Sequence, residues 1–81
     1  MRNSIEKLVP FYRWLFINDN YWKGDAIGYP TKEIYIESKK NQLNVVVKNN
    51  GRKSSGDSRK FNDILDARKY MFDYVKQTTL R

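Results

Sequence analysis

Residues 33–48, EIYIESKKNQLNVVVK, form the most regular stretch of this chain. Aliphatic residues recur at every second position in both halves of it, at Ile34, Ile36, Leu43, Val45 and Val47. A period of two is typical of strands, so the stretch predicts two antiparallel strands joined by a turn at residues 38–42. One face of this hairpin is aliphatic and needs a cover, whereas the other carries Tyr35 and Val46 among polar residues and can face water.

Helical spacing is found on both sides of the hairpin. The first helix is predicted to begin at Asn3 or Ser4. Pro10 marks either a kink in this helix or its true start. The apolar residues at helical spacing are Ile5, Leu8, Val9, Tyr12, Leu15 and Phe16. The second is predicted from about Asn62 or Asp63 to Gln77, with a stripe formed by Ile64, Leu65, Arg68, Met71, Phe72 and Val75.

The remaining segments are rich in turn-forming residues. Residues 18–32 are expected to form a loop or irregular strand, with room for a short strand at residues 26–29, and residues 49–60 lack any large apolar side chain. The whole chain, residues 1–81, is therefore predicted to be one two-layer α+β domain. Its small antiparallel sheet of two or three strands would be covered on one face by an N-terminal and a C-terminal helix.

The composition excludes several kinds of site. The 81 residues include no Cys and no His, which removes disulfides, thiolate nucleophiles, zinc ribbons and the commonest general base. The carboxylates are scattered and no serine has a histidine to activate it, so we expect no enzyme activity, metal or cofactor. No apolar run reaches the roughly 18–20 residues of a membrane span and the N-terminus does not look like a signal peptide, so we expect a cytoplasmic protein, in the host cytoplasm if viral.

The net charge of +7 is concentrated in one segment. Residues 38–60 hold seven basic residues and one acid, a net charge of +6. Such a run is commonly no more than a solvated surface, but interleaved Gly and Ser beside guanidinium groups suit phosphate binding. The candidate nucleic-acid-binding residues are Lys39, Lys40, Lys48, Arg52, Lys53, Arg59 and Lys60, with Tyr35 available to stack on a base.

Half of the 12 aromatic residues lie within residues 11–22, too many for one helix face to bury. Tyr12 and Phe16 are expected to fill the core, because their spacing matches the apolar side of the predicted helix. Trp14, Tyr21 and Trp22 are candidates for a protein interface, with core filling as the alternative for the tryptophans. The surplus of aromatic residues also predicts a homo-oligomer.

The order helix, strands, basic loop, helix resembles that of the double-stranded RNA-binding domain, in which a basic cluster before the final helix meets phosphates. Here that cluster would fall near Arg59 and Lys60. The size, the charge and the Asn-, Lys- and Tyr-rich composition are similar to the early accessory proteins of T4-like phages, among which is a small RNA-binding inhibitor of the ToxN endoribonuclease. That similarity implies sequence-tolerant RNA binding combined with trapping of a host ribonuclease toxin.

The sequence thus predicts a non-catalytic protein that binds nucleic acid, RNA more than DNA, through phosphate contacts of its basic loop. The alternative is an inhibitor or adaptor that binds another protein through an exposed aromatic surface, without nucleic acid.

Overall fold

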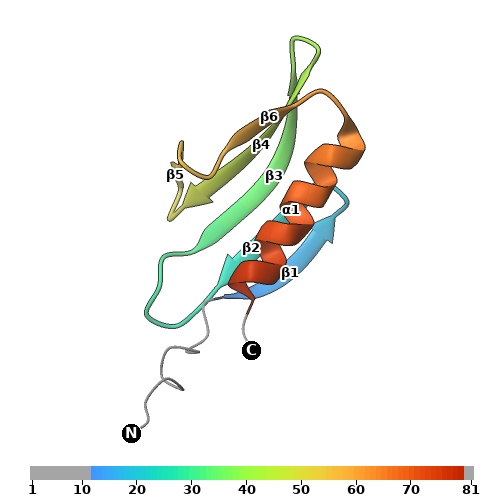
Figure 1. Cartoon of the computed structure of the whole chain (residues 1–81). Helices are drawn as coiled ribbons and strands as arrows, with labels where there is room; N and C mark the ends of the chain where they lie inside the picture. Colours follow the sequence, from blue (N-terminus) through green and yellow to red (C-terminus); the bar gives the residue numbers. More distant parts are fainter. Residues whose placement is uncertain (1–11, 80–81) are drawn as a thin grey trace, which may run out of the picture.

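The predicted hairpin is the centre of the sheet. Its strands β3 (Lys32–Lys39) and β4 (Gln42–Asn49) pair antiparallel along their whole length, from Lys32 with Asn49 to Lys39 with Gln42. The two turn residues, Lys40 and Asn41, both have positive φ angles (51° and 65°), as a two-residue type I′ hairpin turn requires. The structure, a computed structural model, describes residues 12–79 (Figure 1).

Four shorter strands extend this hairpin on both sides, namely β1 (Arg13–Asn18), β2 (Tyr21–Asp25), β5 (Arg52–Lys53) and β6 (Arg59–Phe61). The strand order is β1-β2-β3-β4-β5, with every pair antiparallel. Strands β5 and β6 share the outer edge of β4, because β5 pairs with its Lys48 end and β6 with its Leu43 end. The edge of β4 is therefore covered at both ends, with residues 54–58 connecting the two short strands.

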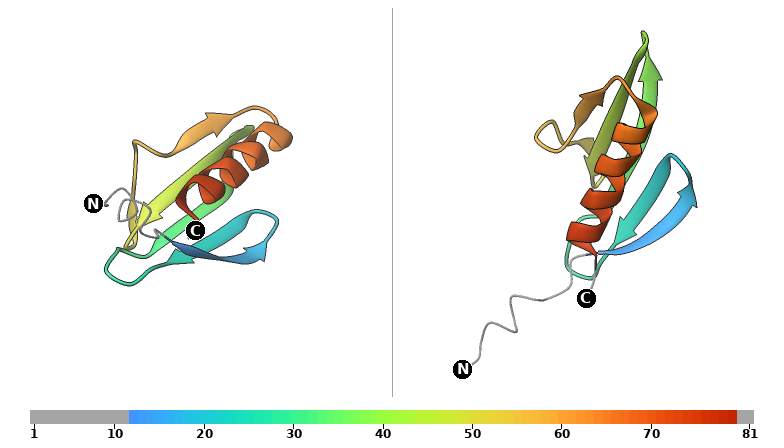
Figure 2. Two further views of the ribbon diagram at one scale, coloured as in Figure 1. Left: turned by 60° about the horizontal axis from the view of Figure 1, so that its bottom comes forward. Right: turned by 45° about the vertical axis from the view of Figure 1, so that its right-hand side comes forward.

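Helix α1 (Ile64–Thr78) lies along one face of the sheet (Figures 1 and 2). It begins at Asp63, whose carboxylate accepts a hydrogen bond from the backbone N–H of Leu65 and so caps the helix. The core lies between the helix and the two central strands and consists of Ile34, Val45, Val47, Ala67, Met71 and Val75. These are the positions at which the period of the hairpin and the period of the helix bring apolar side chains together.

The predicted fold class was wrong in the number of strands and of helices. The described residues form a sheet of six strands rather than two or three, and one helix rather than two. The start of the predicted first helix, including Pro10, lies outside the described residues, but its second half is strand β1. Tyr12, Trp14 and Phe16 also recur with a period of two, and aromatic and β-branched side chains favour strands, so the apolar spacing fitted either element.

The two segments read as loops were also partly wrong. Residues 26–29 form a turn rather than a short strand, and the strand of that region is β2, which lies earlier in the chain. Residues 49–60 contain β5 and part of β6. Asn50 and Gly51, with φ angles of 55° and 86°, form the turn into β5, and this Asn-Gly pair is the strongest short-range sequence signal of a hairpin.

Candidate nucleic-acid interface

The face of the sheet away from α1, here called the open face, carries a set of polar and aromatic side chains in register. Strand alternation and the pairing of adjacent strands place them on the same side. The open face consists of Leu15, Tyr21, Lys23, Glu33, Tyr35, Glu37, Lys39, Asn44, Val46, Lys48, Lys53 and Lys60. None of these residues belongs to the core beneath the helix.

Two tyrosines lie at the centre of the open face. Tyr21 and Tyr35 are register partners on β2 and β3, and their rings meet edge to face with centroids 6.0 Å apart. The Tyr21 hydroxyl donates a hydrogen bond to Glu33, and this bond, with burial and the Glu33 charge, raises the pKa of Tyr21. Both rings are partly exposed, so each presents an edge or a face to solvent.

Lysines lie near these rings, and Glu33, the register partner of both Lys23 and Lys48, forms no salt bridge with either. The ammonium of Lys48 lies 5.7 Å from the centroid of the Tyr35 ring, a cation–π contact that brings a positive charge beside an aromatic face. Among residues 12–79 the one salt bridge joins Lys69 and Asp73 on α1. No described carboxylate therefore forms a salt bridge with a lysine of the open face. Its positive charges are therefore available to an anionic ligand.

Two pockets open on this face, on either side of the Tyr35–Val46 register pair. The first pocket, about 530 Å³, lies over β2 and β3, and its walls include Asn18, Asn20, Tyr21, Glu33, Tyr35 and Lys48. The second, about 340 Å³, lies over β4 at the gap between β5 and β6, and its walls include Glu37, Asn44, Val46, Lys53, Ser58 and Lys60. Both volumes fall within the range of small-ligand sites in proteins.

Residues 54–58, expected to grip phosphate with free hydroxyls and amides, use these groups internally. Ser58 donates from Oγ to the Ser54 carbonyl oxygen (2.7 Å) and accepts from the backbone N–H of Val47 (3.1 Å). The Tyr70 hydroxyl donates to the carbonyl oxygen of Asp57 (2.6 Å), which ties this loop to the helix. The loop therefore shapes the second pocket, and its Ser54 and Ser58 hydroxyls are engaged within the fold.

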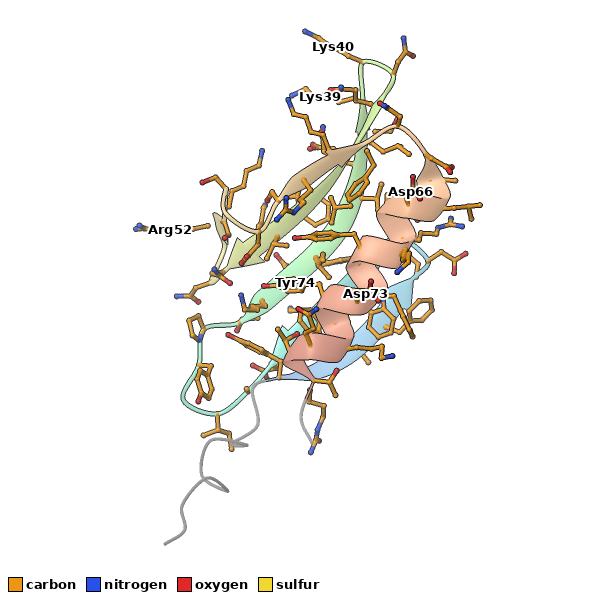
Figure 3. The ribbon with its side chains drawn as sticks, in the orientation of Figure 1. Lys39, Lys40, Arg52, Asp66, Asp73 and Tyr74 are labelled. Atoms are coloured by element: carbon orange, nitrogen blue, oxygen red, sulfur yellow. The ribbon has the colours of Figure 1, made fainter. Side chains whose placement is uncertain are left out.

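The seven predicted basic residues are divided among several places. Lys39, Lys48, Lys53 and Lys60 belong to the open face, whereas Arg59 faces the helix side with its guanidinium carbon 5.6 Å from the Tyr70 ring. Figure 3 shows Lys39 and Lys40 at the tip of the β3–β4 hairpin, and Arg52 extending from the opposite end of β4. On the open face itself, Lys39 and Lys60 lie towards the hairpin tip, and Lys48 and Lys53 lie towards the opposite end.

The predicted interface aromatics do not form one surface. The indole N–H of Trp14 donates to Thr78 Oγ1 (2.9 Å), and the ring packs between Gly24 and Tyr74 as part of the structural interior. Trp22 packs against the core and against Phe16, with ring centroids 5.0 Å apart, while Tyr21 lies on the open face. Phe16, predicted to be buried, is 51% exposed.

Sequence reasoning missed several members of the site, among them Lys23, Glu33, Glu37 and Asn44. Lys23 and Glu33 are register partners across β2 and β3, a pairing hidden by the reading of residues 18–32 as a loop. Asn44 was assigned to the correct face by alternation, but its position in a pocket depends on β6, which the sequence did not predict.

The fold and the open face define a small α+β domain with one helix-covered face and one basic, tyrosine-bearing face. A scan against protein-family models finds no match, and searches of curated proteins and of solved structures find none. Within residues 12–79, α1 is too short and too polar to cross a bilayer.

Proposed function

We propose that this protein binds nucleic acid, RNA in preference to DNA, through the open face of its sheet. The observation that carries the proposal is the combination of Tyr21 and Tyr35 with unpaired lysines on one exposed sheet surface. Aromatic rings stack on unpaired bases, and lysines neutralise the phosphates that link them. The proposal includes action in the cytoplasm, since it requires access to cellular RNA.

A single strand suits this surface better than a duplex. Stacking requires bases that are splayed out, and a sheet with two side-by-side pockets offers room for such bases. The helix is a poor candidate for the major groove, because its net charge is only +1 and it carries Asp66 and Asp73 on its outer surface (Figure 3).

The test is a pair of triple variants that lose the same charge from different surfaces. Lys48→Ala, Lys53→Ala and Lys60→Ala together remove cations from the open face, whereas Arg68→Ala, Lys69→Ala and Lys76→Ala remove them from α1. Binding of a single-stranded RNA is measured across a salt titration. For single strands each neutralised phosphate contributes about 0.7 to the slope of log K against log salt.

We expect the open-face variant to bind more weakly and to lose about 2 from that slope, while the helix variant behaves like the wild type. Equal losses in the two variants would mean that net charge, not this surface, drives binding. Retention of wild-type binding by the open-face variant would refute the proposal.

Exposed apolar side chains on the helix side favour a second candidate function, contact with another protein. Phe16, Ile17, Leu65 and Phe72 are 46–68% exposed. Arg68, which lies between Leu65 and Phe72 on the same flank of α1, hydrogen-bonds to Asn20 in the turn between β1 and β2, so this flank faces the hairpin that carries Phe16. Self-association that is lost in a Phe16→Ser, Phe72→Ser double variant, measured by light scattering, would support this function.

A further inference from the structure

We propose that the second pocket of the open face is a subsite for a nucleobase with an exocyclic amino group, read by the side-chain amide of Asn44. This inference rests on the proposed function and adds a preference among bases to it. It begins with a row of three register partners across the sheet: Glu37 on β3, Asn44 on β4 and Lys60 on β6. All three line the pocket.

Asn44 is the residue that lacks an explanation in the fold. Its Oδ1 is buried and has no hydrogen-bond partner among residues 12–79, and its amide nitrogen has no hydrogen bond there either. Leaving such an acceptor unpaired is unfavourable, and the large majority of buried side-chain polar groups are paired. A pocket-lining amide without a structural partner is therefore suited to a partner from outside the fold.

The amide is also free to turn into the pocket. The last torsion of an Asn side chain is broad and has no sharp staggered minima. No hydrogen bond holds the Asn44 amide, so rotation about this torsion breaks none when Oδ1 turns toward a ligand. Val46 also lines the pocket, but its side chain is almost fully covered (1% exposed), so contact with a base comes mainly from the polar residues.

The chemistry of the pocket selects the kind of base. Asn44 Oδ1 and the Glu37 carboxylate are both acceptors, so the ligand must supply donors on that side. Adenine, cytosine and guanine each present an exocyclic amino group with two N–H donors, one for each acceptor, whereas uracil offers only its single ring N–H. The Asn44 amide nitrogen can donate at the same time to a neighbouring ring nitrogen, as asparagine does in its bidentate contact with adenine. Lys53 and Lys60 remain available for the phosphates.

The experiment compares single-stranded RNA oligonucleotides of A, of C and of U by fluorescence anisotropy, with the full chain. A fourth probe replaces adenosine by purine riboside, which lacks only the amino group. We expect the wild type to bind A and C about tenfold more tightly than U or purine riboside, and Asn44→Ala to bind all four alike. Asn62→Ala, at an exposed position before α1, is the matched control and should keep the wild-type preference.

The outcomes separate this inference from the proposed function. Equal affinity of the wild type for A, C, U and purine riboside would overturn the amino-group subsite while leaving RNA binding intact. A preference that persists in Asn44→Ala would overturn the role of Asn44. Absence of binding to every probe would refute the proposed function itself. If Asn44→Ala does not fold, the comparison of adenosine with purine riboside in the wild type still decides whether the subsite exists.

Discussion

At the scale of single residues, a glycine and a tryptophan determine how the first hairpin packs. Gly24 on β2 is buried opposite Trp14 on β1, and a Cβ placed on Gly24 would lie 2.9 Å from Cε3 of the indole and 3.0 Å from two more ring atoms. The indole cannot move away freely, because its N–H is bonded to Thr78. Glycine is thus required at this position because a side chain would not fit beside the indole. Backbone conformation is not the reason, because the φ angle of Gly24 is not in the left-handed region.

Gly24→Ala is therefore expected to lower the free energy of unfolding by about 1–3 kcal/mol, the usual cost of overpacking a filled interior. Gly56→Ala is the matched control, because a Cβ at Gly56 meets nothing within 4 Å. Urea denaturation of the two variants measures the difference. Equal stability of Gly24→Ala and Gly56→Ala would show that the Trp14 ring does not constrain this position.

Tyr35 is the site residue that the sequence identified most directly. Alternation within residues 33–37 placed it on the face opposite the aliphatic one, and that position needed no knowledge of the other strands. Trp14 and Trp22 could not be assigned in this way, because their neighbours come from β2 and from the end of α1. A single-sequence pattern has no information about which distant element covers a side chain.

At the scale of elements, the loop of residues 54–58 is held to α1 by a polar cluster. The Tyr74 hydroxyl donates to the Asp57 carboxylate (3.2 Å) and accepts from the Lys32 ammonium (2.8 Å), which also donates to Asn49 (2.6 Å). Burial, followed by the nearby Asp57 charge and its hydrogen bond, raises the pKa of Tyr74 above its ordinary value of 10.0. Figure 3 shows Tyr74 reaching from the helix towards the sheet.

This cluster predicts a loss of stability in alkaline solution. The pKa of Tyr74 is higher in the folded chain than in the unfolded chain, so the unfolded chain ionises first as pH rises. The contribution of Tyr74 to the free energy of unfolding is therefore complete below pH 10.0 and decreases above it. One such proton gives a slope of at most about 1.4 kcal/mol per pH unit. The pKa of Lys32 is lowered, chiefly by burial. Its contribution to the free energy of unfolding therefore increases as pH rises towards 10.5, which is the opposite of the Tyr74 effect.

Tyr74→Phe should therefore be less stable at neutral pH, because two hydrogen bonds are lost, but should show a shallower decline above pH 10. Unfolding free energies of the wild type and the variant, measured by denaturant titration at several pH values, test this difference. Parallel declines in the two proteins would exclude Tyr74 as the source of the alkaline slope.

The sequence predicted a strand or helix correctly where the apolar residues followed a single spacing, either two or about 3.6 residues. The β3–β4 hairpin and the extent of the final helix agree with their predictions, because strict alternation and a capped 3.6-residue pattern each have one physical interpretation. The predicted apolar stripe was only partly correct: Met71 and Val75 are buried together with Ala67, whereas Leu65, Arg68 and Phe72 are exposed. Strand β1 was misread, since a run of aromatic and aliphatic residues fits both periods. Strands β5 and β6 are too short for a pattern, although the Asn50-Gly51 turn indicated the first of them.

At the scale of the whole molecule, the two sides of the protein differ in chemistry. The open face presents tyrosines, lysines and two pockets, whereas the helix side has an α1 with a net charge of only +1 and exposes Phe16 and Phe72. The sequence placed the positive charge in the right region of the chain. It gave the main phosphate contacts to the loop, however. Strand register collects Lys23, Lys48, Lys53 and Lys60 on one surface, and register cannot be read from a single strand.

The most direct test of the open face as the binding surface is ultraviolet crosslinking of the protein to a bound single-stranded RNA, with the crosslinked residues located by mass spectrometry. Stacking on the open face predicts crosslinks at Tyr35 and Tyr21, together with loss of the Tyr35 crosslink in Tyr35→Ala. Crosslinks at Phe16, Trp22 or Phe72, with none on Tyr21 or Tyr35, would place the RNA on the helix side and contradict this account.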